Sequence, residues 1–254
     1  MNASISHVLL DIEGTTCPVQ FVSETLFPYA ASKLGAFLDS RTNDVAVQQL
    51  LSQVAQAWKE DPNPAAQVLL KAAPENVILS TRVLPYLQWL IEQDRKFTPL
   101  KELQGLVWEA GYECGALEGP LYEDVAPALH RWRDAGLGLG VYSSGSVKAQ
   151  QLIYGHSNVG DLRPLFQHWF DTTIGPKLEP ESYIQISKDL NTNPQSILFI
   201  SDSIGELTAA RTSGLAVLLC DRDGALNCPT DCKEFATIQS FDKLDPFNLP
   251  KQTS

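Results

Sequence analysis

In the stretch HVLLDIEGTT, residues 7–16, an apolar run is followed by two acids separated by one residue, and then by the sequence Gly-Thr-Thr, which is typical of a turn. Val8, Leu9 and Leu10 have the pattern of a short, fully buried strand. Asp11 would then stand at the carboxyl end of that strand, and ligands of open α/β sheets bind outside that edge. The stretch therefore predicts a parallel sheet with a carboxylate at its edge, where it could act as a nucleophile or a metal ligand.

Three further apolar runs, each followed by a polar turn, are also typical of buried parallel strands. They are residues 137–142, 197–200 and 216–220. Helical patterns lie between the runs, at residues 122–134, 146–153, 180–190 and 205–212. Because strands alternate with helices, we expect an α/β fold with a Rossmann-like parallel sheet covered by helices on both faces.

The chain between the first two strands has no convincing strand pattern. It carries amphipathic helical patterns at residues 21–38, 45–58, 82–92 and 100–109, and a glycine-rich return at 111–120. A structureless connection of that length would be unusual in a compact domain. We therefore predict an inserted helical cap domain at residues 17–117 and a catalytic core formed by residues 1–16 and 118–254.

The composition narrows the class of protein. The 254 residues carry a formal net charge of -11, which argues against a general nucleic-acid surface. The sequence shows neither a secretory signal pattern nor an apolar run of the roughly 20 residues that a membrane span needs. The odd cysteine count of five favours free thiols, and the isolated pair Cys228 and Cys232 does not predict a zinc site. These features favour a cytoplasmic protein with no nucleic-acid or membrane partner.

Asp11 and Glu13 are candidates for paired acid chemistry. Residues two apart on an extended backbone share a face, so both carboxyl groups can point into one cleft. One could attack an electrophile while the other transfers protons. Taken alone, an Asp-x-Glu is more often a polar strand end or a helix cap. Gly14 in the next turn improves the case, because glycine lets an anion approach the backbone closely.

Two other loops carry residues suited to a phosphoryl group. Ser143, Ser144 and Gly145 follow the second strand and precede a helix, where hydroxyls and free N–H groups can bind an anion. In isolation, simple capping of that helix by a serine is slightly favoured over anion binding. Lys177 lies in a Gly-Pro-Lys turn, and its ammonium suits a phosphoryl oxygen or a carboxylate. Most lysines are merely solvated, so Lys177 gains meaning only if the other residues converge on it.

Asp202 closes the third strand in the way that Asp11 closes the first. Two such carboxylates at one sheet edge can hold Mg²⁺, whereas the alternative for Asp202 is a cap for the next helix. Glu206 could either support the metal ligands from behind or be a surface acid near the start of that helix, and the surface acid is favoured. The four histidines show no metal-ligand spacing and are expected to be structural.

The order acid, serine, lysine, acid resembles the haloacid dehalogenase superfamily of phosphohydrolases. Within it, the motifs DIEGTT (11–16), YSSGSV (142–147) and ESY (181–183) are similar to those of the enolase-phosphatases of methionine salvage, also called acireductone synthases. The likeness continues through FPY (27–29), GDL (160–162) and FDT (170–172), and so covers nearly the whole chain. Most phosphatases of the superfamily have aspartate where this chain has Glu13.

The resemblance implies a role for each position already singled out. These are Asp11, Glu13 and Lys177 in catalysis; Ser143, Ser144, Gly145 and Lys177 in substrate binding; and Asp11, Glu13 and Asp202 at a Mg²⁺ ion. It implies a monomeric enzyme that acts on the phosphorylated diketone 2,3-diketo-5-methylthiopentyl-1-phosphate. The products would be the acireductone 1,2-dihydroxy-3-keto-5-methylthiopentene and phosphate, formed by enolisation and then by hydrolysis through an aspartyl-phosphate at Asp11.

Four alternatives compete with this interpretation. Another phosphatase of the same superfamily, acting on sugar or nucleotide phosphates, would share the scaffold and the nucleophile. A dehalogenase would leave Asp202 without a metal to hold. A signalling receiver module is disfavoured by the long insertion between Asp11 and Ser143. A binding protein without catalysis is disfavoured because the set of acids is complete.

Overall fold

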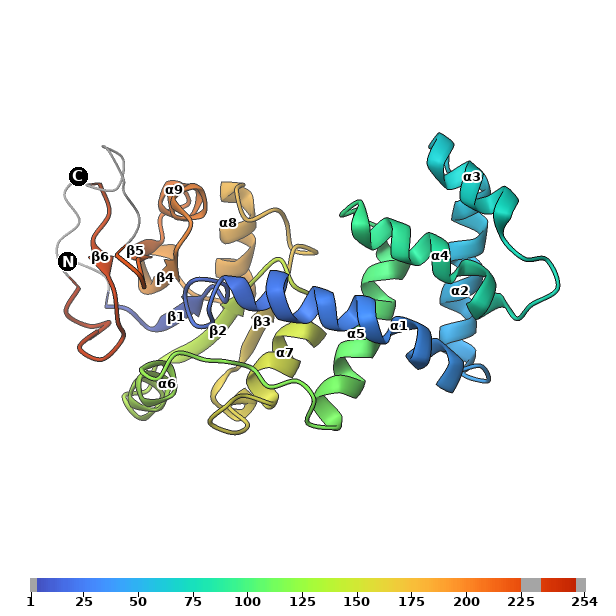
Figure 1. Cartoon of the computed structure of the whole chain (residues 1–254). Coiled ribbons are helices and arrows are strands. Elements are labelled where there is room, and N and C mark those ends of the chain that lie inside the picture. The colour runs from blue at the N-terminus through green and yellow to red at the C-terminus, as the bar shows by residue number, and fades with distance from the viewer. Residues whose placement is uncertain (1–3, 225–233, 250–254) are drawn as a thin grey trace. The chain divides into compact units, whose positions relative to one another are not determined.

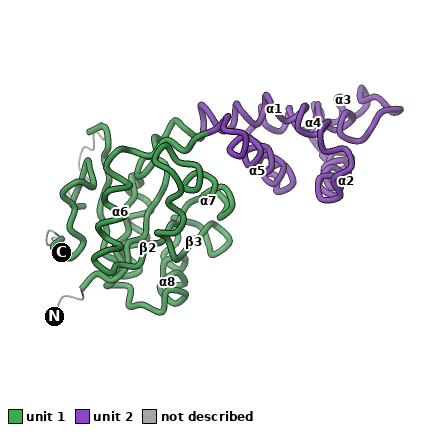
Figure 2. The backbone as a smooth tube through the Cα atoms, turned by 90° about the horizontal axis from the view of Figure 1, so that it is seen from below, with its two compact units in different colours: residues 1–21, 118–254 green, residues 22–117 purple. Residues whose placement is uncertain are grey.

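The computed structural model describes residues 4–224 and 234–249, and the chain divides into two compact units (Figures 1 and 2). One unit combines the two ends of the chain, up to Phe21 and from Glu118 onward, and the other is Val22–Leu117. The predicted insertion starts earlier, at residue 17. Cys17 belongs to the first unit, and its carbonyl accepts the Gly14 N–H at 2.8 Å. The cysteine pair at 228 and 232 lies outside the described residues.

The core unit is built on a parallel sheet of six strands in the order β3-β2-β1-β4-β5-β6. The strands are β1 (His7–Leu10), β2 (Gly138–Tyr142), β3 (His168–Phe170), β4 (Ile197–Ser201), β5 (Ala216–Cys220) and β6 (Thr237–Ile238). The predicted α/β class and the four predicted strands are confirmed. The short outer strands β3 and β6 were not predicted.

Helices cover both faces of this sheet, with α6 and α7 on one side and α8 and α9 on the other (Figure 1). They are α6 (Val125–Asp134), α7 (Val147–Gly155), α8 (Pro180–Asp189) and α9 (Ile204–Thr212), with 3₁₀ turns at Arg163–Leu165 and Pro194–Ser196. On the side of α8 and α9, Leu9 and Phe199 of the strands pack with Tyr183 and Leu207 of the helices, all buried. The sheet therefore has the continuous apolar strands that helices on both faces require.

The strand register brings the polar strand ends to one edge of the sheet. Leu10 at the end of β1 pairs with Val141 of β2 and with Ile200 of β4. Asp11 continues this pairing, because its N–H donates to the Ile200 carbonyl at 3.0 Å. The residues that follow β1, β2 and β4 consequently start from neighbouring positions, as the sequence predicts.

The second unit, Val22–Leu117, is helical in its described secondary structure. Its helices are α1 (Phe27–Ser40), α2 (Val45–Glu60), α3 (Pro64–Ala72), α4 (Leu79–Glu92) and α5 (Thr98–Glu113), and a π-helical turn η1 (Phe21–Leu26) precedes α1. Asp44 caps α2 by accepting the N–H groups of Ala46 and Val47. The helix α3 was not predicted, and α5 continues into the stretch expected to form the return. Across the described residues of both units, no helix is long and apolar enough to span a membrane.

Candidate active site

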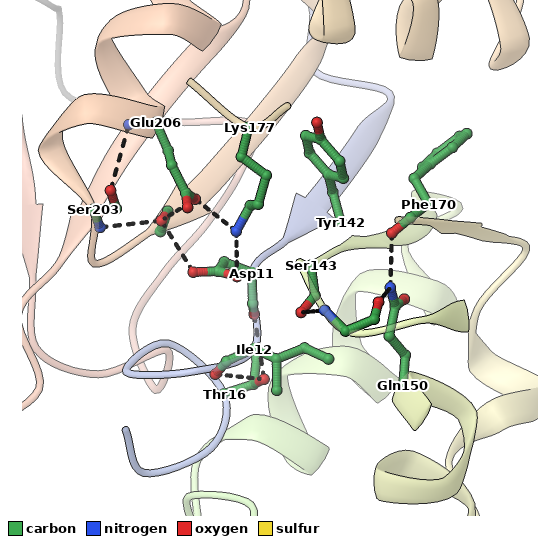
Figure 3. Close-up of polar contacts among 12 residues, drawn as sticks. Asp11, Ile12, Thr16, Tyr142, Ser143, Gln150, Phe170, Lys177, Ser203 and Glu206 are labelled. Carbon is green, nitrogen blue, oxygen red and sulfur yellow. Dashed lines mark hydrogen bonds and ion pairs between the residues drawn. The ribbon is translucent and has the colours of Figure 1, made fainter. Parts of the chain in front are cut away.

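Asp11 is buried at the carboxyl end of the central strand β1, with 5% of its surface exposed. Its Oδ1 lies 2.6 Å from Lys177 Nζ, and its Oδ2 accepts a hydrogen bond from Ser201 Oγ at 3.2 Å. The Asp11 main-chain carbonyl accepts the Thr16 hydroxyl at 3.3 Å. The carboxylate is thus fixed in orientation with a positive charge on one oxygen (Figure 3).

Lys177 is brought to Asp11 from the loop that precedes α8. Its Nζ pairs with both Asp11 and Glu206 (Figure 3). It lies 2.6 Å from Asp11 Oδ1 and 2.6 Å from Glu206 Oε2. The side chain is buried, and burial alone would lower the pKa of the ammonium. The carboxylates of Asp11 and Glu206 outweigh that effect and raise the pKa of Lys177. The structure therefore gives this lysine the convergence that sequence alone could not show.

The favoured interpretation of Glu206 as a surface acid is wrong, and its contacts fit the alternative of a supporting group. Its side chain is mostly buried, pairs with Lys177 and accepts a hydrogen bond from Ser201 Oγ at 3.0 Å. Ser203 caps α9 by accepting the Glu206 N–H at 3.5 Å, which places Glu206 in the first helical turn. Burial, then the charge of Asp11, raises the pKa of Glu206 to about 7, against the opposing effect of Lys177. Its spacing of one helical turn after Asp202 was the available signal in the sequence.

Glu13 and Asp202 complete an acidic group at this edge. Burial, and then the charge of Asp11, raises the pKa of Glu13 and raises that of Asp202 to about 6, while Lys177 opposes both shifts. The loop after β1 passes close to Asp202 because Gly14 has a φ of +68° and no side chain. A Cβ at that position would lie 2.1 Å from Asp202 Oδ2. A side chain at this position would be strained by the positive φ and would displace the Asp202 carboxylate.

The donor set at this edge fits a hard divalent cation, because Mg²⁺ prefers carboxylate and carbonyl oxygens. Burial first, and then repulsion from Asp11, raises the pKa of Asp202, and a bound cation would favour the ionised carboxylate against both effects. Within residues 4–224 and 234–249, no three His, Cys, Asp or Glu side chains form a metal-binding group. A Mg²⁺ site here would therefore need other oxygens, such as a main-chain carbonyl. The choice of Asp11, Glu13 and Asp202 as metal ligands stays a prediction.

The loop after β2 is held from several sides. The Ser143 hydroxyl is buried and accepts the Gly145 N–H at 3.2 Å, and the Ser143 N–H donates to the Phe170 carbonyl at 3.2 Å. Gln150 Nε2 donates to the carbonyls of Gly145 and Phe170, both at 2.8 Å (Figure 3). This loop is therefore a fixed element next to β1. The use of Ser143, Ser144 and Gly145 in substrate binding stays a prediction.

The start of α7 is capped by residues other than Ser143 and Ser144. Ser146 is the N-cap and accepts the Ala149 N–H at 3.3 Å. Asp171, which follows β3, accepts the Val147 N–H at 3.1 Å. The N-cap of α7 is thus Ser146 rather than Ser143 or Ser144. Asp171 belongs to the FDT motif, and its role at this helix start was not predicted.

Arg222 supports the loop after β1 from behind and was missed in the sequence. Its Nε and Nη2 donate to the Thr15 carbonyl at 2.9 and 2.7 Å, and its Nη1 lies 2.6 Å from Asp124 Oδ2. The guanidinium lies over the rings of Tyr122 and Phe241, at 4.5 and 4.4 Å from their centroids. Nothing in the pattern around residue 222 indicated this distant contact.

Comparison with known proteins agrees with this geometry. Residues 5–214 match the haloacid dehalogenase-like hydrolase family. A protein of Synechococcus sp. (strain RCC307) named "Enolase-phosphatase E1" is 52% identical over 248 residues, covering 97% of each chain. One of the same name from Pseudomonas fluorescens (strain Pf0-1) is 44% identical, covering 96% of this chain and 98% of its own.

A solved structure is similar over the same length. The crystal structure of the UTR4 protein from Saccharomyces cerevisiae has a TM-score of 0.76 at 33% sequence identity, with 94% of this chain and 100% of that chain covered. Dehalogenase structures at 18% identity and a TM-score of 0.53 share the fold. From the family match, the relatives and the acid–lysine site together, we conclude that this chain belongs to the enolase-phosphatase E1 family of haloacid dehalogenase-like hydrolases.

Proposed function

We propose that this chain is a magnesium-dependent enolase-phosphatase that converts 2,3-diketo-5-methylthiopentyl-1-phosphate into 1,2-dihydroxy-3-keto-5-methylthiopentene and phosphate. The observation that carries the proposal is Asp11, buried at the sheet edge with Lys177 Nζ 2.6 Å from one carboxylate oxygen. Glu13 lies two residues on, and its raised pKa suits a group that must both give and take a proton. Relatives named Enolase-phosphatase E1 over nearly the full chain support the substrate.

In the phosphatase half, an Asp11 carboxylate oxygen attacks phosphorus, and the bond from phosphorus to the enol oxygen breaks. Glu13 gives its proton to the departing enol oxygen. Glu13 then takes a proton from water, whose oxygen attacks phosphorus and releases phosphate from Asp11. Lys177 and the loop of Ser143, Ser144 and Gly145 balance the charge on the phosphoryl oxygens.

The enolisation half removes a proton from a carbon beside a carbonyl group of the diketone and adds one to the carbonyl oxygen, which gives the enol. Glu13 is the candidate for this transfer, because burial and the neighbouring Asp11 charge raise its pKa. A Mg²⁺ ion held by the carboxylates of Asp11 and Asp202 and the main-chain oxygen of Glu13 would act as a Lewis acid on substrate oxygens. Lys177 and the loop of Ser143, Ser144 and Gly145 orient the phosphate, so that enolisation and phosphate hydrolysis can take place in one site.

The proposal extends to the rest of the molecule. The inserted helical unit is proposed to serve as a cap domain that selects the phosphate ester. The enzyme is proposed to be monomeric and cytoplasmic, with a small phosphorylated diketone as its partner and neither nucleic acid nor membrane. Light scattering of the purified protein and cell fractionation test those two properties.

The direct test incubates the purified protein with the diketone phosphate and magnesium, and follows enol absorbance and free phosphate together. We expect both signals, with enol formation preceding phosphate release. A panel of sugar and nucleotide phosphates is run in parallel. Faster turnover of a panel member without enol formation would replace this proposal with a general phosphatase of the same superfamily, and EDTA resistance would overturn the metal dependence.

A further inference from the structure

Three successive main-chain carbonyls of the Lys177 loop each accept a hydrogen bond from a side-chain hydroxyl. Tyr142 donates to the Gly175 carbonyl at 2.9 Å. Ser182 donates to the Pro176 carbonyl at 2.7 Å, and Tyr183 donates to the Lys177 carbonyl at 2.8 Å. The proposed chemistry uses none of these hydroxyls.

The side chains that donate these bonds are closed off from solvent. Tyr142 and Tyr183 are fully buried and Ser182 is 2% exposed, so none of them can touch a substrate. Tyr142 belongs to β2, whereas Ser182 and Tyr183 belong to α8. The two tyrosine rings contact each other edge to face at 5.4 Å, and Tyr183 also packs on Phe199 of β4 at 5.3 Å. The hydroxyls are therefore mounted on the sheet and on a packed helix.

The loop itself has little regular structure to hold it. Gly175 has a φ of +147°, and a Cβ there would lie 2.2 Å from Ser182 Oγ. Pro176 has no N–H to donate. Yet this loop must place a buried ammonium within 2.6 Å of two different carboxylates. A side chain as long as lysine reaches such a position reproducibly only if its main chain is fixed.

We propose that Tyr142, Ser182 and Tyr183 are positioning residues, which fix the main chain of Gly175–Lys177 and so hold the Lys177 ammonium between Asp11 and Glu206. The inference rests on the proposed function in so far as Lys177 is taken to act in turnover. The three hydroxyls act only through the lysine. Tyr142 adds a second contact, since its ring centroid lies 5.7 Å from Lys177 Nζ (Figure 3).

The competing explanation is that these hydroxyls only satisfy buried carbonyls and stabilise the fold. A matched control separates the two. Tyr86 in the helical unit is also buried, and its hydroxyl donates to Asp61 Oδ2 at 2.7 Å. Tyr86→Phe removes the same atom as Tyr183→Phe and also breaks one buried hydrogen bond, but it leaves the Lys177 loop intact.

The kinetic test compares these two variants with the wild type at a temperature where circular dichroism shows all three fully folded. Tyr183→Phe should lower kcat for phosphate release about tenfold, with KM changed less than twofold, because the lysine is misplaced in the folded enzyme. Tyr86→Phe should leave both constants unchanged. Equal constants for Tyr183→Phe and the wild type would overturn the inference.

A second measurement does not depend on turnover. In protein labelled with ¹⁵N-lysine, the buried Lys177 ammonium should give a slowly exchanging resonance that Lys177→Arg removes. Tyr183→Phe and Ser182→Ala should shift or broaden that resonance, and Tyr86→Phe should preserve it. An unchanged resonance in both loop variants would overturn the positioning role. A changed resonance in a protein that never turns over the diketone would overturn the proposed function alone.

Discussion

Asp11 in the core unit and Asp61 in the helical unit are equally buried, each 5% exposed, but their surroundings differ. Asp61 accepts the Tyr86 hydroxyl at 2.7 Å and the Asn63 N–H at 2.9 Å, and lies 3.4 Å from Arg95. Burial would raise the pKa of Asp61, but these two hydrogen bonds and the Arg95 charge outweigh it and lower that pKa. The charge and the hydrogen-bonding capacity of Asp61 are therefore compensated within the folded protein.

Around Asp11, by contrast, several carboxylates lie close enough to repel one another. Its ammonium partner, Lys177, is shared with Glu206. Asp11 contributes, after burial, to the raised pKa of Glu13, Asp202 and Glu206. Carboxylates placed this way cost stability, and they are typical of a site whose charges serve a bound ligand. Burial alone therefore does not distinguish a structural carboxylate from a functional one, because the charged neighbours decide the difference.

The strongest test of this contrast is Asp11→Asn. The amide cannot form an aspartyl-phosphate, so phosphate release should fall by roughly 1,000-fold or more. Stability should stay near that of the wild type, because the substitution removes one of the repelling carboxylates and Lys177 keeps Glu206 as its partner. Phosphate assays and urea unfolding measure the two effects. Full turnover in the variant would show that Asp11 is not the nucleophile.

Arg222→Lys tests whether the acidic site depends on the hydrogen bonds that Arg222 donates to the loop after β1. Lysine cannot give two parallel hydrogen bonds to the Thr15 carbonyl and a third to Asp124 as the guanidinium does. The loop that carries Glu13 should shift, and kcat should fall roughly 10- to 100-fold. Steady-state kinetics measures the loss. A kcat within twofold of the wild type would mean that the loop keeps its place without this clamp.

Asp61→Asn should give the opposite result to Asp11→Asn. The loss of charge-assisted bonds to Tyr86 and Arg95 should lower the free energy of unfolding by about 2 kcal/mol, while kcat of the folded enzyme is unchanged. The pKa of Asp61 is lower in the folded protein than its unfolded value of 3.8. Its contribution to the free energy of unfolding is therefore present above pH 3.8 and is lost as the pH falls through the folded pKa. Urea titrations at neutral and acid pH measure both effects. A variant as stable as the wild type would contradict the contrast.

The central part of the fold was predictable because its signals are local. Strands β1, β2, β4 and β5 consist mainly of apolar residues, most of them buried. The end strand β6 has only two residues, and β3 has three half-buried ones, too few for a periodic pattern. Their positions depend on pairing with β5 and β2, and that pairing is set by tertiary contacts.

In the site, residue types were predictable but their shared partners were not. Asp11, Lys177 and Asp202 follow from strand ends and turns. The ion pair between Lys177 and Glu206, and the clamp of Arg222 on Thr15, join segments that meet only after the sheet has formed. A glutamate at the start of a helix is usually exposed. Glu206 departs from that rule because it pairs with the buried Lys177.

The smallest predicted effect lies at the start of β1, where His7 and the His168 ring lie 6.2 Å apart. Burial, and then His168, lowers the pKa of His7, and burial lowers that of His168. An unfolded histidine takes up its proton near pH 6.5, whereas the folded pair resists it. Stability from this pair is therefore present above that pH and is lost as pH falls through it, by less than about 1 kcal/mol after solvent screening of these half-buried rings.

The acidic site works in the opposite direction over the same pH range. Asp202 and Glu206, whose pKa values are raised to about 6 and about 7, stabilise the folded state as pH falls. A single wild-type curve therefore mixes the two sets of groups, and the difference between wild type and His168→Gln isolates the contribution of His168, including its charge effect on His7. In magnesium-free buffer, urea unfolding at pH 7.5 and 5.5 should show a smaller acid loss, or a larger acid gain, for His168→Gln. The same pH dependence in both proteins would mean that the titration of His168 does not couple to folding.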